Sequence, residues 1–228
     1  MNDTIVLAGF GTTPLELLSF FLSIATVLLN IRRNHWAWLF AIVSSAAYGL
    51  VFFNARLYGD AGLQAVFIAA SVWGWQLWLR GAGNRPLVVT RLRRAGWAWS
   101  LAGWALGFVL LAAFLGRYTD TDVPYMDGFL TAGSLLGQVL LARKKVENWH
   151  TWIAVDVLYV GLYLYKGLHL TALLYALFVA LAVVGLRAWR AAADAGAPAG
   201  ADGADGTSTE APHAADLARG AGAGAGAE

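Results

Sequence analysis

The feature that most limits the fold of this chain is an internal repeat of apolar sequence. Residues 55–80 align without a gap with residues 166–191, an offset of 111. Upstream, residues 15–38 align with 129–152 at an offset of 114. Most of the matches are between common apolar residues, but a few are harder to obtain by chance: Gly74 with Gly185, Trp78 with Trp189, Asn34 with Asn148 and Trp38 with Trp152. Repeated apolar halves are typical of secondary transporters, whose substrate site lies between the halves.

The composition places the chain in a lipid bilayer. Hydrophobic residues make up 59% of the sequence and charged residues 13%, which is too little charge to cover a surface that faces water. Several apolar runs approach the roughly 20 residues that cross the hydrocarbon core. The net charge of +2 comes from basic residues in short loops, so no nucleic-acid partner is expected. The absence of cysteine excludes disulfides and thiolate metal sites.

The sequence predicts an all-α membrane protein. Hydropathy suggests seven transmembrane helices at about 15–31, 36–53, 60–79, 96–116, 128–143, 149–166 and 169–190. Basic residues concentrate in the loops after the first, third and fifth helices: Arg32, Arg33, Arg80, Arg85, Arg91, Arg93, Arg94, Arg143, Lys144 and Lys145. By the positive-inside rule, the N-terminus is predicted outside the cytoplasmic membrane and the C-terminus in the cytoplasm.

The repeat then predicts the domain organisation. The first helix matches the fifth, and a shift of four crossings preserves direction, so the halves are expected to be parallel repeats of three helices joined by the fourth helix. This 3+1+3 arrangement divides the chain into an extracytoplasmic N-terminus, a first repeat, a linker region, a second repeat and a disordered cytoplasmic tail: 1–14, 15–79, 80–127, 128–190 and 191–228.

The strongest candidate for a substrate site is a polar and aromatic stripe on the sixth helix. Its members are spaced to lie on one helix face: Trp149, Trp152, Asp156, Tyr159 and Tyr163. A carboxyl group in the hydrocarbon zone marks a site by default, because burying it without partners is costly. Aromatic rings beside it suit a flat, hydroxylated ligand that carries positive charge. At the offset of 114, Asp156 corresponds to Ile42, so its role is expected to be confined to the second half.

Other interpretations of the stripe remain open. Trp149 and Trp152 could belong to the aromatic belt at the membrane interface, the two tyrosines could pack along a seam between helices, and Asp156 could form a purely structural hydrogen bond. Additional polar residues are candidates for the substrate path: Gln64, Gln138 and Tyr48. Trp75 and Trp78 are expected to be interface anchors, because they lie near Arg80.

Several chemistries are not expected. The three lysines follow no glycine-rich loop, so the chain has no site for direct use of ATP. The histidines at 35, 150, 169 and 213 do not have metal-ligand spacing, and no pairing of a nucleophile with a base stands out. The sequence therefore predicts no catalytic residue, no metal and no cofactor, and a protein that is not an enzyme.

The stripe resembles that of the PnuC family of bacterial vitamin transporters, whose W-x-x-W-x-x-x-N/D pattern occurs here as Trp149, Trp152 and Asp156. The segments RKKVENW, GLHLTALLYALFVAL and GLQAVFIAASVWGWQLW are also similar to the family, and the resemblance covers residues 15–190. It implies a fold like that of the SWEET sugar transporters, a homotrimer, and facilitated uptake of nicotinamide riboside by alternating access. A cytoplasmic kinase would then trap the substrate for NAD biosynthesis. Thiamine, riboflavin or a sugar, or a sensor without transport, remain alternatives.

Overall fold

The structure, a computed structural model, describes residues 5–7, 10–12, 14–54, 58–81, 87–119, 121–165, 167 and 169–195. The predicted tail beyond residue 195 and the loop residue Arg85 lie outside the described residues. Within them the chain forms seven helices: α1 (Pro14–Ile31), α2 (Trp36–Asn54), α3 (Tyr58–Arg80), α4 (Arg94–Tyr118), α5 (Pro124–Ala142), α6 (Asn148–Tyr165) and α7 (His169–Ala195). A short antiparallel pair of strands, which the sequence did not predict, precedes them: β1 (Ile5–Leu7) and β2 (Phe10–Thr12).

The predicted helices agree with the observed ones apart from their ends. Helix α7 is the largest exception, because it continues past residue 190 to Ala195. The residues that follow Arg190 are mostly alanine, the best helix former, so the helix extends into the segment that had been assigned to the tail. By length and composition, two stretches of the described chain could cross a membrane, Arg94–Tyr118 and Thr171–Ala195. Helix α4 exposes large apolar side chains, with Trp99 78% and Leu106 62% exposed.

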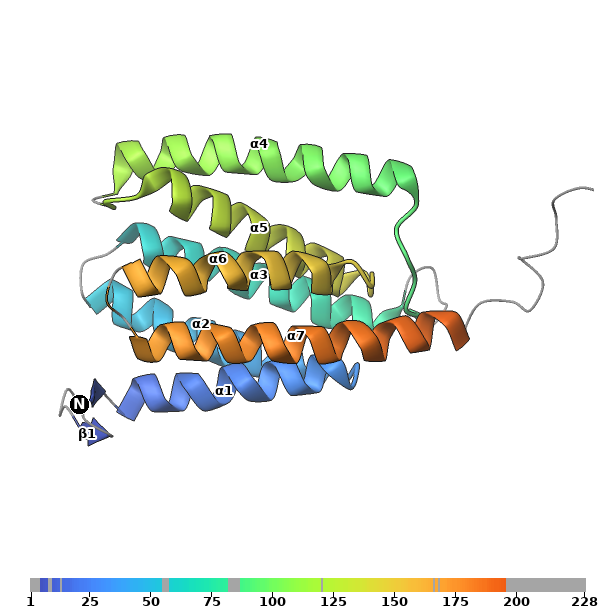
Figure 1. Cartoon of the computed structure of the whole chain (residues 1–228), viewed down its shortest axis with the longest axis horizontal. Coiled ribbons are helices and arrows are strands. Elements are labelled where there is room, and N and C mark those ends of the chain that lie inside the picture. The colour runs from blue at the N-terminus through green and yellow to red at the C-terminus, as the bar shows by residue number, and fades with distance from the viewer. Residues whose placement is uncertain are drawn as a thin grey trace, which may run out of the picture. The chain divides into compact units, whose positions relative to one another are not determined.

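The helices lie side by side and alternate in direction, so that α1, α3, α5 and α7 run one way and α2, α4 and α6 the other (Figure 1). Each helix packs against the next in sequence, except that α3 packs against α5 instead of α4. Helix α1 also packs against α7. Helices α1, α3 and α5 end on the same side of the bundle, which we call the basic end. Its described turns and helix ends carry a set of cationic side chains: Arg32, Arg33, Arg80, Arg143, Lys144 and Lys145.

The turn between α1 and α2 has the same backbone structure as the turn between α5 and α6. Arg33 and Lys144 both adopt positive φ, 57° and 50°. Their amides make matching bonds, Arg33 N to Asn30 O at 3.0 Å and Lys144 N to Leu141 O at 2.9 Å. Every such pair of positions differs by 111.

The offset of 114 expected for this stretch is therefore wrong, and 111 holds through the turn as it does for α3 and α7. The sequence misled because tryptophans recur in both turns, so an alignment shifted by about one helical turn still pairs one indole with another. In the corrected register Asp156 corresponds to Ser45 rather than Ile42. Tyr48 then corresponds to Tyr159, while Gln64 corresponds to Tyr175 as it did in the first alignment.

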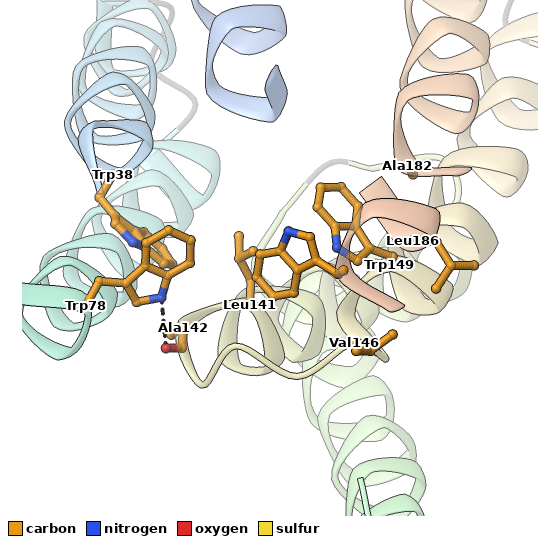
Figure 2. Close-up of a cluster of buried hydrophobic side chains, with 9 residues drawn as sticks. Trp38, Trp78, Leu141, Ala142, Val146, Trp149, Ala182 and Leu186 are labelled. Carbon is orange, nitrogen blue, oxygen red and sulfur yellow. Dashed lines mark hydrogen bonds between the residues drawn. The ribbon is translucent and has the colours of Figure 1, made fainter. Parts of the chain in front are cut away.

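Each half packs one tryptophan against a glycine of the next helix. A Cβ atom at Gly74 would lie 2.4 Å from the Trp38 ring, and one at Gly185 would lie 2.6 Å from the Trp149 ring. Neither contact leaves room for a side chain. The rings also form matching edge-to-face pairs, Trp38 with Trp78 at 5.5 Å and Trp149 with Trp189 at 5.6 Å. These rings belong to the main hydrophobic core, which lies at the basic end (Figure 2).

The chain between α3 and α4 is tied to the second half at the basic end. Thr90 N donates to Lys144 O over 3.1 Å, and Val146 N donates to Thr90 O over 3.0 Å, which forms a short parallel bridge. Arg91 pairs with Asp194 near the end of α7 at 2.7 Å. This segment holds the turn between α5 and α6 from outside the bundle.

Candidate functional site

Helix α6 carries the predicted stripe and begins where the sequence placed it. The Asn148 side chain donates to the Lys145 carbonyl over 2.6 Å at the turn that precedes the helix. Two turns further on, Asp156 is buried, with only 5% of its surface exposed. A buried carboxyl group in the middle of an apolar helix is costly, so it requires polar neighbours or water.

Three tyrosines gather beside Asp156, on the side away from the basic end. The rings of Tyr159 and Tyr163 stack at 5.7 Å with an interplanar angle of 16°. Tyr175 from α7 packs against both, at 4.7 Å and 5.1 Å. We call Tyr159, Tyr163 and Tyr175 the tyrosine cluster. Asp156 precedes Tyr159 by three residues on α6, so the two side chains lie on one helix face.

Tyr175 was not singled out from the sequence. It stands alone in the apolar run of α7, where one tyrosine is indistinguishable from a packing residue. The signal that could have found it is the alignment of residues 55–80 with 166–191, in which Tyr175 occupies the position of Gln64, which was already a candidate. Tyr48 on α2 is the counterpart of Tyr159, and it lies within electrostatic range of Tyr163 in the other half.

The two tryptophans of the stripe lie in different surroundings. Trp152 is half-buried and lies over α5, where a Cβ at Gly137 would be 2.9 Å from its ring. Trp149 is 3% exposed and sits in the core cluster with Gly185 and Trp189. A belt residue faces lipid, so that alternative is wrong for Trp149. Trp149 lies about 15 Å along the helix axis from Tyr159.

The expectation that Trp78 is an interface anchor is also wrong. Its indole is 9% exposed and donates to the Ala142 carbonyl over 3.0 Å. The neighbouring Arg80 suggested an interface position, but the helix turns Trp78 inward onto α5. Trp75 is partly buried against the same core cluster.

The two glutamines occupy different interfaces. Gln138, a candidate for the substrate path, donates from its Nε2 to the Ser71 hydroxyl over 3.0 Å and so joins α5 to α3. Gln64 is half-buried on α3 and faces α2, since its Cβ would lie 3.4 Å from a Cβ at Gly49. No cluster of three His, Cys, Asp or Glu side chains that could hold a metal occurs in the part of the chain that the structure describes.

The described site residues are therefore an acidic group, an aromatic cluster and polar side chains from α2, α3, α5, α6 and α7. Residues 13–191 match the sequence profile of the nicotinamide mononucleotide transporter family. The chain belongs to this family, the PnuC family. The resemblance seen in the sequence is thereby confirmed, and the protein is a vitamin transporter of the PnuC family.

Characterised relatives carry different vitamins. The riboflavin/roseoflavin transporter RibM of Streptomyces davaonensis is 32% identical over 74% of this chain and 80% of its own length. The nicotinamide riboside transporter PnuC of Escherichia coli is 24% identical over 66% of this chain and 74% of its own length. These relatives are transporters, in agreement with the prediction of a protein that is not an enzyme.

A solved structure supports the PnuC fold. The crystal structure of a vitamin B3 transporter PnuC superposes with a TM-score of 0.66 at 21% sequence identity. The match covers 79% of this chain and 82% of that one, so the predicted all-helical fold is confirmed at the level of the seven-helix family.

Proposed function

We propose that this PnuC-family protein takes up riboflavin across the cytoplasmic membrane by facilitated diffusion, through alternating access between two halves, α1–α3 and α5–α7. The observation that carries the proposal is the buried Asp156 beside the half-buried tyrosine cluster, which offers aromatic faces and polar tips. The basic end would face the cytoplasm, by the positive-inside rule.

The 3+1+3 arrangement is supported by the repeated turns. Equivalent hydrogen bonds occur at positions separated by 111, and helices α1 and α5 run in the same direction (Figure 1). Parallel halves of this kind pack about a pseudo-twofold axis along the membrane normal, and their shared interface is the usual place for substrate. Tyr48 of the first half lies within electrostatic range of Tyr163 of the second.

Riboflavin is favoured by sequence similarity to a riboflavin transporter and by the size of the aromatic surface of the tyrosine cluster. The riboflavin transporter shares 32% identity with this chain and the nicotinamide riboside transporter 24%. Three clustered tyrosine rings offer more stacking area than a single small ring needs, and stacking strength rises with the area of the planes in contact. The hydroxyl groups of Tyr159, Tyr163 and Tyr175 supply partners for a polar ligand chain.

Nicotinamide riboside is the second candidate, and Asp156 is the observation in its favour. A carboxylate attracts a cationic pyridinium ring but gives no such advantage to a neutral flavin. If this substrate is carried, a cytoplasmic kinase would trap it after entry. A homotrimer, which the family resemblance implies, would leave one such site in each subunit.

A ligand panel on the purified protein tests the proposal. Riboflavin, nicotinamide riboside, thiamine and a sugar are compared by thermal shift, because a true ligand raises the unfolding temperature by mass action. Flux is then measured as counterflow into proteoliposomes. We expect riboflavin to give the largest shift and to exchange. A shift and counterflow with nicotinamide riboside alone would replace riboflavin by the second candidate. Binding without flux would indicate a sensor instead.

A further inference from the structure

At the basic end, one tryptophan in each half of the bundle donates a hydrogen bond to the other half. Trp78 Nε1 on α3 donates to the Ala142 carbonyl at the end of α5 over 3.0 Å. Trp189 Nε1 on α7 donates to the carbonyls of Asn30 and Ile31 at the end of α1, over 3.1 and 3.2 Å. Trp189 is the counterpart of Trp78, and Ala142 that of Ile31, at the offset of 111. The same bond is therefore made twice, in opposite directions across one interface.

The rings themselves fill the space between the halves. Trp78 and Trp189 lie 6.2 Å apart, and each packs edge-to-face on the tryptophan of its own half, Trp38 or Trp149. Trp38 is 1% exposed and Trp189 0% exposed. Figure 2 shows Trp38 and Trp78 on one side of the cluster, Trp149 near Val146 on the other, and the bond from Trp78 to Ala142. At this end the two halves are held in direct contact.

Two kinds of contact can be separated in the cluster. Trp38 and Trp149 are fixed within their own halves, because each ring lies against a glycine that admits no side chain. The contacts made by Trp78 and Trp189 with α5 and α1 cross between the halves. A movement of one half against the other therefore parts the cluster between Trp78 and Trp189 and leaves each edge-to-face pair intact.

We propose that these four tryptophans form the gate at the basic end of the transport path, and that the structure is the state in which this gate is closed. Opening breaks the bonds from Trp78 to Ala142 and from Trp189 to Asn30 and Ile31. The inference rests on the proposed function, because only a transporter needs to open at this end.

The closed gate leaves some of its buried N–H groups without hydrogen-bond partners in the described chain, which lowers the free energy needed to open it. The indole N–H groups of Trp38 and Trp149 are buried and have no hydrogen-bond partner among the described residues. Water that enters an opened gate would bond to both of them, which offsets the loss of the two bonds between the halves. Lys144, whose ammonium lies 4.7 Å from the Trp78 ring, adds a further contact from the second half to the first.

The chain has no native cysteine, so one introduced thiol can report on the gate. Ser71 is a suitable position, because it is 1% exposed on α3 at the contact with α5 and lies about 10 Å deeper than Trp78. The Ser71→Cys protein is reconstituted in vesicles, and a membrane-impermeant maleimide is applied from one side or the other. Trp78→Phe and Trp189→Phe keep an aromatic ring and remove the N–H donor.

We expect maleimide applied at the basic end to label Ser71→Cys slowly. Each Trp→Phe replacement should raise that rate by about fivefold, the factor that corresponds to one ordinary hydrogen bond. The two effects should multiply in the double variant. The matched control is Trp99→Phe, since Trp99 is 78% exposed on α4 and should leave the rate unchanged.

Three results would overturn the gate: a double variant that labels as slowly as Ser71→Cys alone, acceleration only from the opposite side, or equal acceleration by Trp99→Phe. Vitamin binding and counterflow are measured on the same proteins. Faster labelling without riboflavin binding would leave the gate standing and refute riboflavin as the substrate. Normal riboflavin uptake with unchanged labelling would refute the gate and leave riboflavin transport standing.

Discussion

Gln138 on α5 donates a hydrogen bond of 3.0 Å to the Ser71 hydroxyl on α3, and both side chains are buried. Ser71→Ala leaves the amide of Gln138 without this partner, which should lower the free energy of unfolding by about 1–3 kcal/mol. The measurement is thermal unfolding in detergent. Adding Gln138→Leu removes the stranded amide, so the double variant should lose less stability than the two single losses added together. Strict additivity would show that the bond contributes nothing.

The glycines beneath the tryptophans give a sharper stability test. A Cβ at Gly185 would lie 2.6 Å from the Trp149 ring, so Gly185→Ala must displace a buried indole and should cost about 1–3 kcal/mol. Gly74→Ala should behave alike against Trp38. The matched control is Gly103→Ala on α4, where a Cβ meets nothing within 4 Å and helix propensity predicts a gain of about 1 kcal/mol. Equal melting temperatures for Gly185→Ala and Gly103→Ala would contradict the packing argument.

The sequence predicts where the helices lie along the chain, but it does not predict which face of each helix is buried. All seven helices could be predicted: six from apolar runs bounded by charged or glycine-containing turns, and the fifth, whose apolar signal is weaker, from its match to the first helix in the repeat. Which way a tryptophan points could not be predicted. Trp78 sits beside Arg80 in sequence, yet it reaches α5, and only the packing of α3 on α5 decides this. An apolar helix that faces protein on one side and lipid on the other has too weak a pattern to indicate its buried face.

The candidate site was partly predictable for the same reason. Asp156 stands out because a carboxyl group in an apolar helix is rare and costly, and the spacing to Tyr159 and Tyr163 follows from helix geometry. Tyr175 carries no such signal, because a tyrosine in a membrane helix costs little. Its place in the tyrosine cluster depends on how α7 packs on α6, which no local pattern specifies.

Asp156→Asn separates the two candidate ligands. Opposite unit charges about 4 Å apart attract by a few kcal/mol in a partly dry site, so loss of the carboxylate should weaken nicotinamide riboside by on the order of tenfold or more. Riboflavin is neutral and should bind to Asp156→Asn within about twofold of its affinity for the unchanged protein, since asparagine keeps the shape and one acceptor oxygen. Isothermal titration with both ligands measures the two ratios. If riboflavin binding falls as steeply as that of the cation, the carboxyl group has another role, such as ordering the tyrosines.

Tyr175 provides a specific test of the tyrosine cluster, because it packs on both of the other rings. Its ring packs at 4.7 Å from Tyr159 and 5.1 Å from Tyr163. Tyr175→Leu removes an aromatic face and should weaken riboflavin by about 1 kcal/mol or more, roughly a factor of five, whereas Tyr175→Phe keeps the face and should lose less. Quenching of flavin fluorescence on binding gives the dissociation constants. Tyr118→Leu is the control, since Tyr118 is 68% exposed on α4. A Tyr175→Leu protein that melts normally and binds riboflavin as tightly as the Tyr118→Leu control would place the ligand elsewhere in the bundle.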